Sequence, residues 1–131
     1  ERGLIRKLNS NGNGFAYSRG IPAEVSDIAA GRQGNVFATA SSAQELRVLK
    51  ISPDGRDFKF ALSFNGTLKN EADPASGAGA SVGMAVAVSP TGSVYVGGYS
   101  ESLNFPTTNG STRSLDTRAC SQDAVFFVIQ P

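Results

Sequence analysis

Residues 86–99 read Val86-Ala-Val-Ser-Pro-Thr-Gly-Ser-Val-Tyr-Val-Gly-Gly-Tyr99, and Asn104-Phe-Pro-Thr-Thr108 follows a few residues later. Two apolar runs flank a Pro-Thr-Gly turn, which is the pattern of a β-hairpin. A weaker copy lies upstream at Ile28-Ala-Ala-Gly-Arg-Gln-Gly-Asn-Val-Phe-Ala-Thr-Ala40. A repeated unit of short strands cannot bury its own apolar face, so the repetition predicts units that stack on one another.

Period-two runs bounded by Gly, Pro, Asn and Asp predict nine strands and no helix of comparable strength. The predicted strands cover residues 4–9, 15–19, 25–30, 35–40, 46–52, 57–64, 82–89, 93–99 and 124–130. Gly12, Gly34, Gly55 and Gly92 stand in the predicted turns, where glycine adopts positive φ without steric cost. The fold class is therefore predicted to be all-β.

A second internal match predicts where the long connections lie. Lys7-Leu-Asn-Ser-Asn-Gly12 matches Lys50-Ile-Ser-Pro-Asp-Gly55 at a shift of 43 residues, whereas the copies at Ile28 and Val86 lie 58 residues apart. The extra length falls in a loop at 65–81 that is rich in Gly, Ala and Ser, and a second long connection is predicted at 100–123. Connections of this length within a compact unit are more often binding loops or insertions than core.

The composition narrows the classes of partner. The 131 residues carry 12 basic and 11 acidic side chains, a net charge of +1, and neither sign forms a run that could follow a phosphate backbone. We therefore expect no nucleic-acid partner. The chain has no apolar run long enough for a membrane span and no leader-like start, and its first residue, Glu1, suggests a processed or excerpted segment.

No catalytic, cofactor or metal site is predicted. The chain contains no histidine, which excludes a Ser-His-Asp or Cys-His relay and imidazole-bound zinc within this segment. Cys120, the single cysteine, has no evident base and is interpreted as an incidental thiol or an intermolecular partner. The asparagines at 9–13 and the carboxylates Asp54 and Asp57 are the residues that tight turns select, and we assign them to turns.

Most aromatic residues lie on or beside predicted strands, where they are expected to fill the space between sheets. Tyr99 and Phe105 differ, because they lie at a strand end and in a long connection. Arg113 and Arg118 belong to the same connection. These four residues form the predicted interaction surface.

The second unit resembles a known repeat. Residues 87–98, Asn104-Phe-Pro-Thr-Thr108 and Asp123-Ala-Val-Phe-Phe-Val-Ile129 together are similar to the seven-bladed β-propeller repeat of bacterial surface and secreted proteins, abbreviated SBBP. The first unit lacks Phe-Pro-Thr-Thr and passes from Ala40 to Leu46 through a short link, which looks more like the NHL type of blade. The resemblance implies an extracellular or cell-surface location in a bacterium.

The resemblance also implies an architecture of four-stranded antiparallel blades. The chain then comprises a partial blade at 1–19, a blade at 25–64 and a partial blade at 82–131, or about two and a quarter blades, whereas a closed ring usually takes about four to eight. The ring would be incomplete. Either the chain is excerpted from a longer propeller, or copies complete one another's blades and cover the open sheet edges.

Three classes of function follow. The first is a non-catalytic scaffold or recognition module that binds a protein or glycan through loops 65–81 and 100–123. The second is an enzyme whose active site is completed by further blades, with Asp27, Arg32 or Glu101 supplied by this chain. The third is a structural subunit that assembles by strand complementation. In each case the expected partners are other blades, from a longer chain or from copies of this one.

Overall fold

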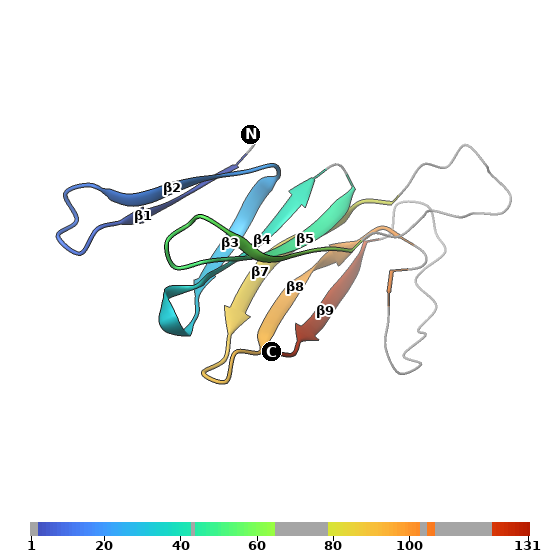
Figure 1. The fold of residues 1–131 in the computed structure, drawn as a ribbon. Helices are drawn as coiled ribbons and strands as arrows, with labels where there is room; N and C mark the ends of the chain where they lie inside the picture. The colour runs from blue at the N-terminus through green and yellow to red at the C-terminus, as the bar shows by residue number, and fades with distance from the viewer. Residues whose placement is uncertain (1–2, 43, 65–78, 103–104, 107–121) are drawn as a thin grey trace, which may run out of the picture.

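The computed structural model describes residues 3–42, 44–64, 79–102, 105–106 and 122–131. They form nine β-strands in three antiparallel sheets (Figure 1). The only helical element in the described ranges is a short 3-10 turn at Arg32–Gly34. The prediction of an all-β fold is confirmed, and every strand lies within two residues of its predicted position.

The strands follow one another along the chain within each sheet. The first sheet is a hairpin of β1 (Gly3–Leu8) and β2 (Phe15–Ile21). The middle sheet has the order β3 (Glu24–Ala30), β4 (Val36–Ser42), β5 (Glu45–Ile51) and β6 (Phe58–Phe64). The third sheet has the order β7 (Ser81–Val88), β8 (Val94–Ser100) and β9 (Asp123–Ile129).

The tight turns are built as their sequences predict. Gly12, Gly34, Gly55 and Gly92 all have positive φ, between 69° and 94°. In the two Ser-Pro-x-Gly turns the glycine amide donates to the serine carbonyl, at 2.9 Å for Gly55 and 3.0 Å for Gly92. Any side chain at these positions would strain the backbone, which explains why glycine stands in each turn.

The internal repeat extends to the irregularities of the strands. The register between β3 and β4 shifts at Ser26, and the register between β7 and β8 shifts at Met84, 58 residues later. The register of β1 with β2 shifts after Lys7, and that of β5 with β6 shifts after Lys50, 43 residues later. Bulges bend a strand and increase its twist. The equivalent strands therefore share their bends as well as their sequence pattern.

The middle sheet is packed on both faces. On one face the first sheet covers it, and Ile5 and Ile21 join a buried cluster with Ala38, Leu49 and Ile51. On the other face the third sheet covers it, and the second cluster contains Phe37, Leu46 and Val48 from the middle sheet with Val86, Val94 and Val96 from the third. Burying such side chains is the main stabilising contribution, about 2 kcal/mol for each large aliphatic group.

Two features bring the third sheet close to the middle one. Gly83 of β7 faces Thr39 of β4, and a Cβ atom at Gly83 would overlap the Thr39 hydroxyl and lie 3.2 Å from Cγ of Leu46. The backbone amide of Val86 donates a hydrogen bond of 2.9 Å to Oδ2 of Asp27. The glycine permits the close approach, and the carboxylate fixes the position of β7 beside β3.

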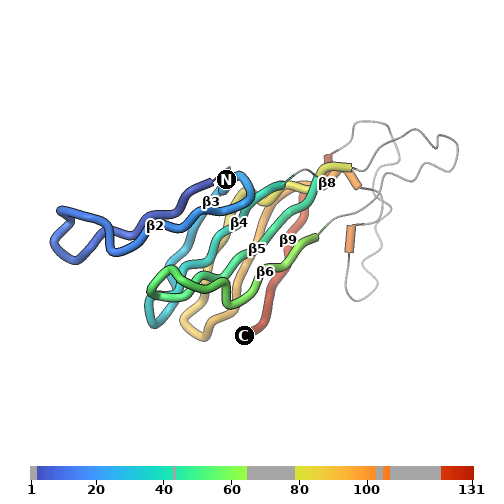
Figure 2. The backbone as a smooth tube through the Cα atoms, turned by 45° about the horizontal axis from the view of Figure 1, so that its top comes forward, coloured from blue at the N-terminus to red at the C-terminus, as the bar shows by residue number. Residues whose placement is uncertain are grey.

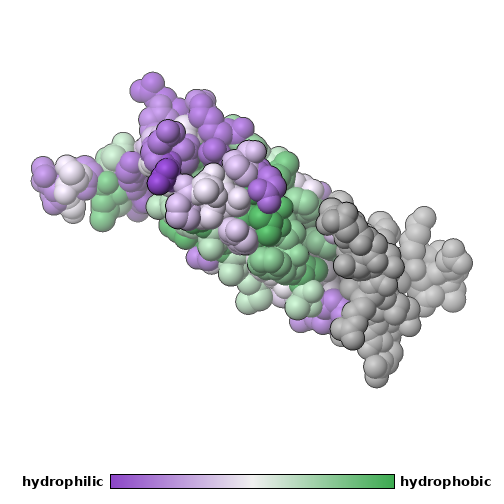
Figure 3. All heavy atoms as spheres, turned by 90° about the horizontal axis from the view of Figure 1, so that it is seen from below, coloured by the Kyte–Doolittle hydropathy of each residue, from purple (hydrophilic) through white to green (hydrophobic). Residues whose placement is uncertain are grey.

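The face of the third sheet that points away from the middle sheet carries exposed apolar side chains. Tyr95, Phe126 and Val128 are all exposed there, and the Tyr95 and Phe126 rings stack with centroids 6.3 Å apart. Seen from below, the molecule shows an area of hydrophobic residues over its middle, beside the residues drawn in grey (Figure 3). Large apolar patches on a protein surface commonly mark contact sites.

Candidate interaction surface

Both long connections begin and end at the same end of the sheets: the first joins the middle sheet to the third, and the second joins β8 to β9. In the strand register Ser81 lies opposite Ser100, and Ser100 lies opposite Asp123, while Phe64 ends β6 beside Leu46. The turns that contain Gly34, Gly55 and Gly92 lie at the other ends of these strands, so the molecule has a tight-turn end and a long-connection end (Figure 2). Residues 65–78 and 107–121 lie outside the described ranges.

A cluster of buried serines ties the start of β7, which the first long connection enters, to the end of β8, which the second leaves. The Ser81 and Ser100 hydroxyls lie 2.9 Å apart, and the Ser102 hydroxyl donates to the Gly79 carbonyl at 3.1 Å. The Glu101 amide donates to the Ala80 carbonyl at 2.8 Å. Because buried hydroxyls need partners, this mutual satisfaction stabilises one geometry of the segments 79–81 and 100–102.

Phe105 packs against one residue of β6 and one residue of β9. Its ring centroid lies 6.4 Å from that of Phe64 and 6.4 Å from that of Phe127, and the Phe64 and Phe127 centroids lie 4.5 Å apart. The Phe105 side chain is only 8% exposed. It therefore has a packing role in the structure, whereas the sequence predicted that it would face a ligand.

The other predicted contact residues are placed differently. Tyr99 is half-buried near the end of β8, paired across the sheet with Val82 and Ala124. Arg113 and Arg118 lie outside the described residues, and so does Cys120. A contact surface formed by Tyr99, Arg113 and Arg118 stays a prediction.

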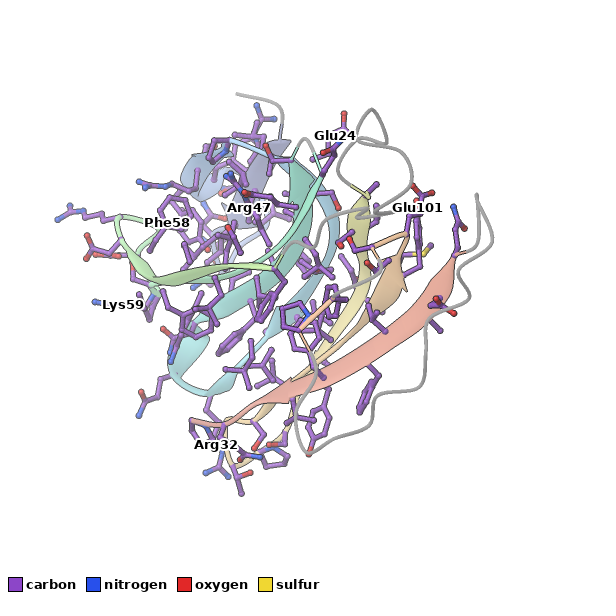
Figure 4. All side chains as sticks on the ribbon, turned by 90° about the vertical axis from the view of Figure 1, so that its right-hand side faces the viewer. Glu24, Arg32, Arg47, Phe58, Lys59 and Glu101 are labelled. Carbon is purple, nitrogen blue, oxygen red and sulfur yellow. The ribbon has the colours of Figure 1, made fainter. Side chains whose placement is uncertain are left out.

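The residues named for an enzymatic alternative do not come together in the described part of the chain. Arg32 and Glu101 lie at opposite ends of the sheets (Figure 4). The Asp27 carboxylate accepts hydrogen bonds from the backbone amides of Ile28 and Val86, both at 2.9 Å, and the Glu101 carboxylate accepts one from the side-chain amide of Gln122 at 3.0 Å. Asp27 thus has a structural role, because it joins two sheets.

Asn9, Asn13 and Asp54, which the sequence assigned to turns, form hydrogen bonds within those turns. The Asn9 side-chain amide donates to Oδ1 of Asn13 at 2.8 Å. Asp54 accepts from the Ser52 hydroxyl at 2.6 Å and from the Arg56 amide at 3.1 Å, and these hydrogen bonds lower the pKa of Asp54. Across the described residues, no group of three His, Cys, Asp or Glu side chains could hold a metal ion.

A shallow groove at the tight-turn end was not predicted. It lies between β2 and the β5–β6 turn and is lined by Tyr17, Arg19, Pro53 and Arg56 among others. The Arg19 guanidinium donates to the Arg56 carbonyl at 2.9 Å and lies 4.3 Å from the centroid of the Phe58 ring. Burial and the nearby Asp54 charge raise the pKa of Tyr17. The two contacts of Arg19 join residues 37 and 39 positions apart, which no local sequence pattern can reveal.

No family model matches the chain, and comparison with curated proteins and with solved structures gives no match either. In the described ranges, no helix is long and apolar enough to cross a lipid bilayer.

Proposed function

We propose that the chain is a non-catalytic segment of a β-propeller, in which each sheet is a blade, and that it acts as a scaffold or recognition module. The protein would be secreted or displayed on the surface of a bacterial cell. Its ligand would be a protein or a glycan bound at the long-connection end. The observation that carries the proposal is the repeated face-to-face stacking of sheets with the same strand register.

The stacking supports the blade interpretation in detail. The middle and third sheets each begin with a strand that is bulged at the equivalent position, Ser26 or Met84. Each sheet then proceeds strand by strand to its edge, with antiparallel neighbours throughout. Successive sheets of one design, each contacting only its neighbours, are typical of repeat architectures.

The arrangement of the connections supports recognition. At one end the strands are closed by tight turns, whereas the other end carries both long connections beside two short links, at 22–23 and 43–44. Binding residues are concentrated on loops that a rigid framework positions. The serine cluster, which includes Ser81 and Ser100, provides that framework where the first loop ends and the second begins.

A binding survey tests the proposal. The chain would be applied to a glycan array and, immobilised, to bacterial surface and host extracellular extracts, followed by identification of the bound molecules. Replacing Arg113 and Arg118 with alanine should weaken the binding found in this way by about tenfold or more, as expected for arginines at an interface. Replacing Arg32 and Arg56, which belong to the tight-turn end, is the matched control and should leave binding unchanged. Absence of any ligand, together with measurable turnover of a substrate, would contradict the proposal.

A further inference from the structure

The exposed large apolar side chains are concentrated on the two end sheets. The third sheet exposes Met84, Tyr95, Phe126 and Val128, and the first sheet exposes Leu4, Leu8 and Phe15. On the middle sheet, the described residues include only two such side chains, Ile28 and Leu62. The surface of the stack is therefore most apolar at its two ends.

The outward face of the third sheet is equivalent to a face that is buried elsewhere in the molecule. Tyr95 corresponds to Phe37 in the 58-residue repeat, and Phe126 pairs with Gly97 as Val48 pairs with Thr39. Phe37 is 4% exposed and Val48 is 0% exposed, because the third sheet covers them. Tyr95 is 39% exposed and Phe126 is 72% exposed. The outward face of the third sheet is thus equivalent to the face of the middle sheet that packs against the third sheet.

The outward face of the first sheet is equivalent to the opposite face of the middle sheet, which packs against the first sheet. In the 43-residue repeat Phe15 corresponds to Phe58, and Leu8 corresponds to Ile51. Ile51 is buried and Phe58 packs beside it, on the face of the middle sheet that contacts the first sheet. Phe15, by contrast, is 57% exposed. The two ends of the stack therefore carry the two halves of one kind of sheet-to-sheet contact.

The exposure of Ile28 and Leu62 on the middle sheet is also explained by the sheets that lie beside them. Ile28 corresponds to Val86, which is buried, but the sheet next to Ile28 has only two strands among the described residues. Leu62 lies on β6 opposite Val48, facing a sheet with three described strands. In both cases the neighbouring sheet has fewer strands than the middle one. Exposure is decided by whether a neighbouring sheet lies over the position.

From these equivalences we infer that the outward face of β7–β9 is a docking surface for the first sheet of a second copy of this chain. The inference rests on the stacked repeat of the proposed function, and it extends the contact between the middle and third sheets by one further unit. Phe126 and Val128 of one copy would pack against Leu8 and Phe15 of the next. Such a contact joins two different surfaces, so it builds head-to-tail assemblies.

Charge is compatible with this contact. The outward positions of the third sheet named above carry no charged side chain among the described residues. The outward face of the first sheet contributes Arg6, whose guanidinium lies 4.9 Å from the centroid of its own Phe15 ring. A guanidinium in that place meets the aromatic face formed by Tyr95 and Phe126, which is an attractive pairing.

Sedimentation velocity of the full chain over a wide concentration range tests the inference. The wild type should form dimers and longer species as its concentration rises. Phe126→Glu and Phe15→Glu should each weaken self-association by about 30-fold or more, as for aromatic residues at the centre of an interface. Leu62→Glu, an exposed apolar position outside both faces, is the matched control and should associate like the wild type. Circular dichroism verifies that every variant is folded.

Mixing the two variants identifies the occupant of the face. Phe126→Glu retains an intact first sheet and Phe15→Glu retains an intact third sheet, so an equimolar mixture should form one-to-one dimers and no longer species. Two results would overturn the inference: a folded wild type that stays monomeric at every concentration, or a Phe15→Glu variant that associates like the wild type. Neither result bears on ligand binding at the long-connection end, which the binding survey measures separately.

Discussion

The two faces of the third sheet belong to the same strands and have similar composition, yet one is core and the other is surface. Val94 and Val96 point toward the middle sheet and are buried, whereas Tyr95, between them, points away and is exposed. On β9 the same contrast separates Phe127, which packs in the core, from Phe126 and Val128, which do not. Residue type alone therefore does not determine burial here; a neighbouring sheet does.

The largest expected effect contrasts two glycines of the third sheet. Gly83→Val places a side chain against Thr39 and Leu46, and we expect it to lower the free energy of unfolding by about 3 kcal/mol, since the two sheets must move apart. Gly97→Val, with nothing within 4 Å of its Cβ position, should change stability by less than about 0.5 kcal/mol. Urea unfolding followed by circular dichroism measures both. Equal losses of stability at the two positions would mean that the inward and outward faces of the third sheet are equally packed in solution.

A pair of valines tests the same contrast by deletion. Val96→Ala creates a cavity between the middle and third sheets and should cost about 2 kcal/mol. Val128→Ala removes the same atoms from the outward face, where the side chain is partly in water, and should cost less than about 1 kcal/mol. Thermal and urea unfolding of dilute, monomeric samples give the two values. A greater loss at Val128 would indicate that its face is covered even in the monomer.

A smaller effect is expected from the hydrogen bond between the middle and third sheets. Asp27→Ala leaves the Val86 amide without its carboxylate acceptor, and we expect a loss of about 1.5 kcal/mol. Asp57→Ala is the matched control, because among the described residues that carboxylate forms only an exposed ion pair with Lys59 at 3.8 Å, which should contribute less than about 0.5 kcal/mol. Urea titrations that give the two variants the same midpoint would assign Asp27 no part in holding the sheets together.

The smallest effect concerns a turn that lies outside both faces. The hydrogen bond from Ser52 holds the pKa of Asp54 below its ordinary value of 3.8. A carboxyl group with a lowered pKa in the folded state stabilises the protein above its pKa in the unfolded chain, and this contribution is lost as the pH falls through the folded-state value. Wild type should therefore be slightly more stable than Asp54→Asn at neutral pH, and the difference should vanish in acid. Unfolding midpoints at several pH values test this, and a difference that grows in acid would contradict it.

The strands and turns could be predicted from the sequence because their signals are local. Alternation of apolar and polar residues places β1 to β9, and the glycine at the end of each Ser-Pro-x-Gly motif marks a turn that requires positive φ. The repeat spacing also indicated that the units would be similar in shape, and the bulges at Ser26 and Met84 are similar to a degree that no strand pattern specifies.

The contacts between sheets could not be predicted in the same way. The Asp27 carboxylate meets the Val86 amide across 59 residues of sequence, and a bulge one residue away decides the direction in which it points. Phe105 lies in a segment that reads as a loop, but Phe64 and Phe127 from two different sheets provide it with a buried site. Side chains on both faces of β8 and β9 are apolar, so alternation alone could not identify which face is covered.

The bonds among Ser81, Ser100 and Ser102 have a consequence for how this protein can change. They fasten the start of β7, which the first long connection enters, to the end of β8, which the second leaves, so the geometry there is fixed within the sheet framework. We therefore expect insertions and replacements at 65–78 and 107–121 to leave this frame intact, whereas Phe105, which packs against Phe64 and Phe127, must be kept. The same clamp makes this end a suitable place to graft foreign binding segments onto the scaffold.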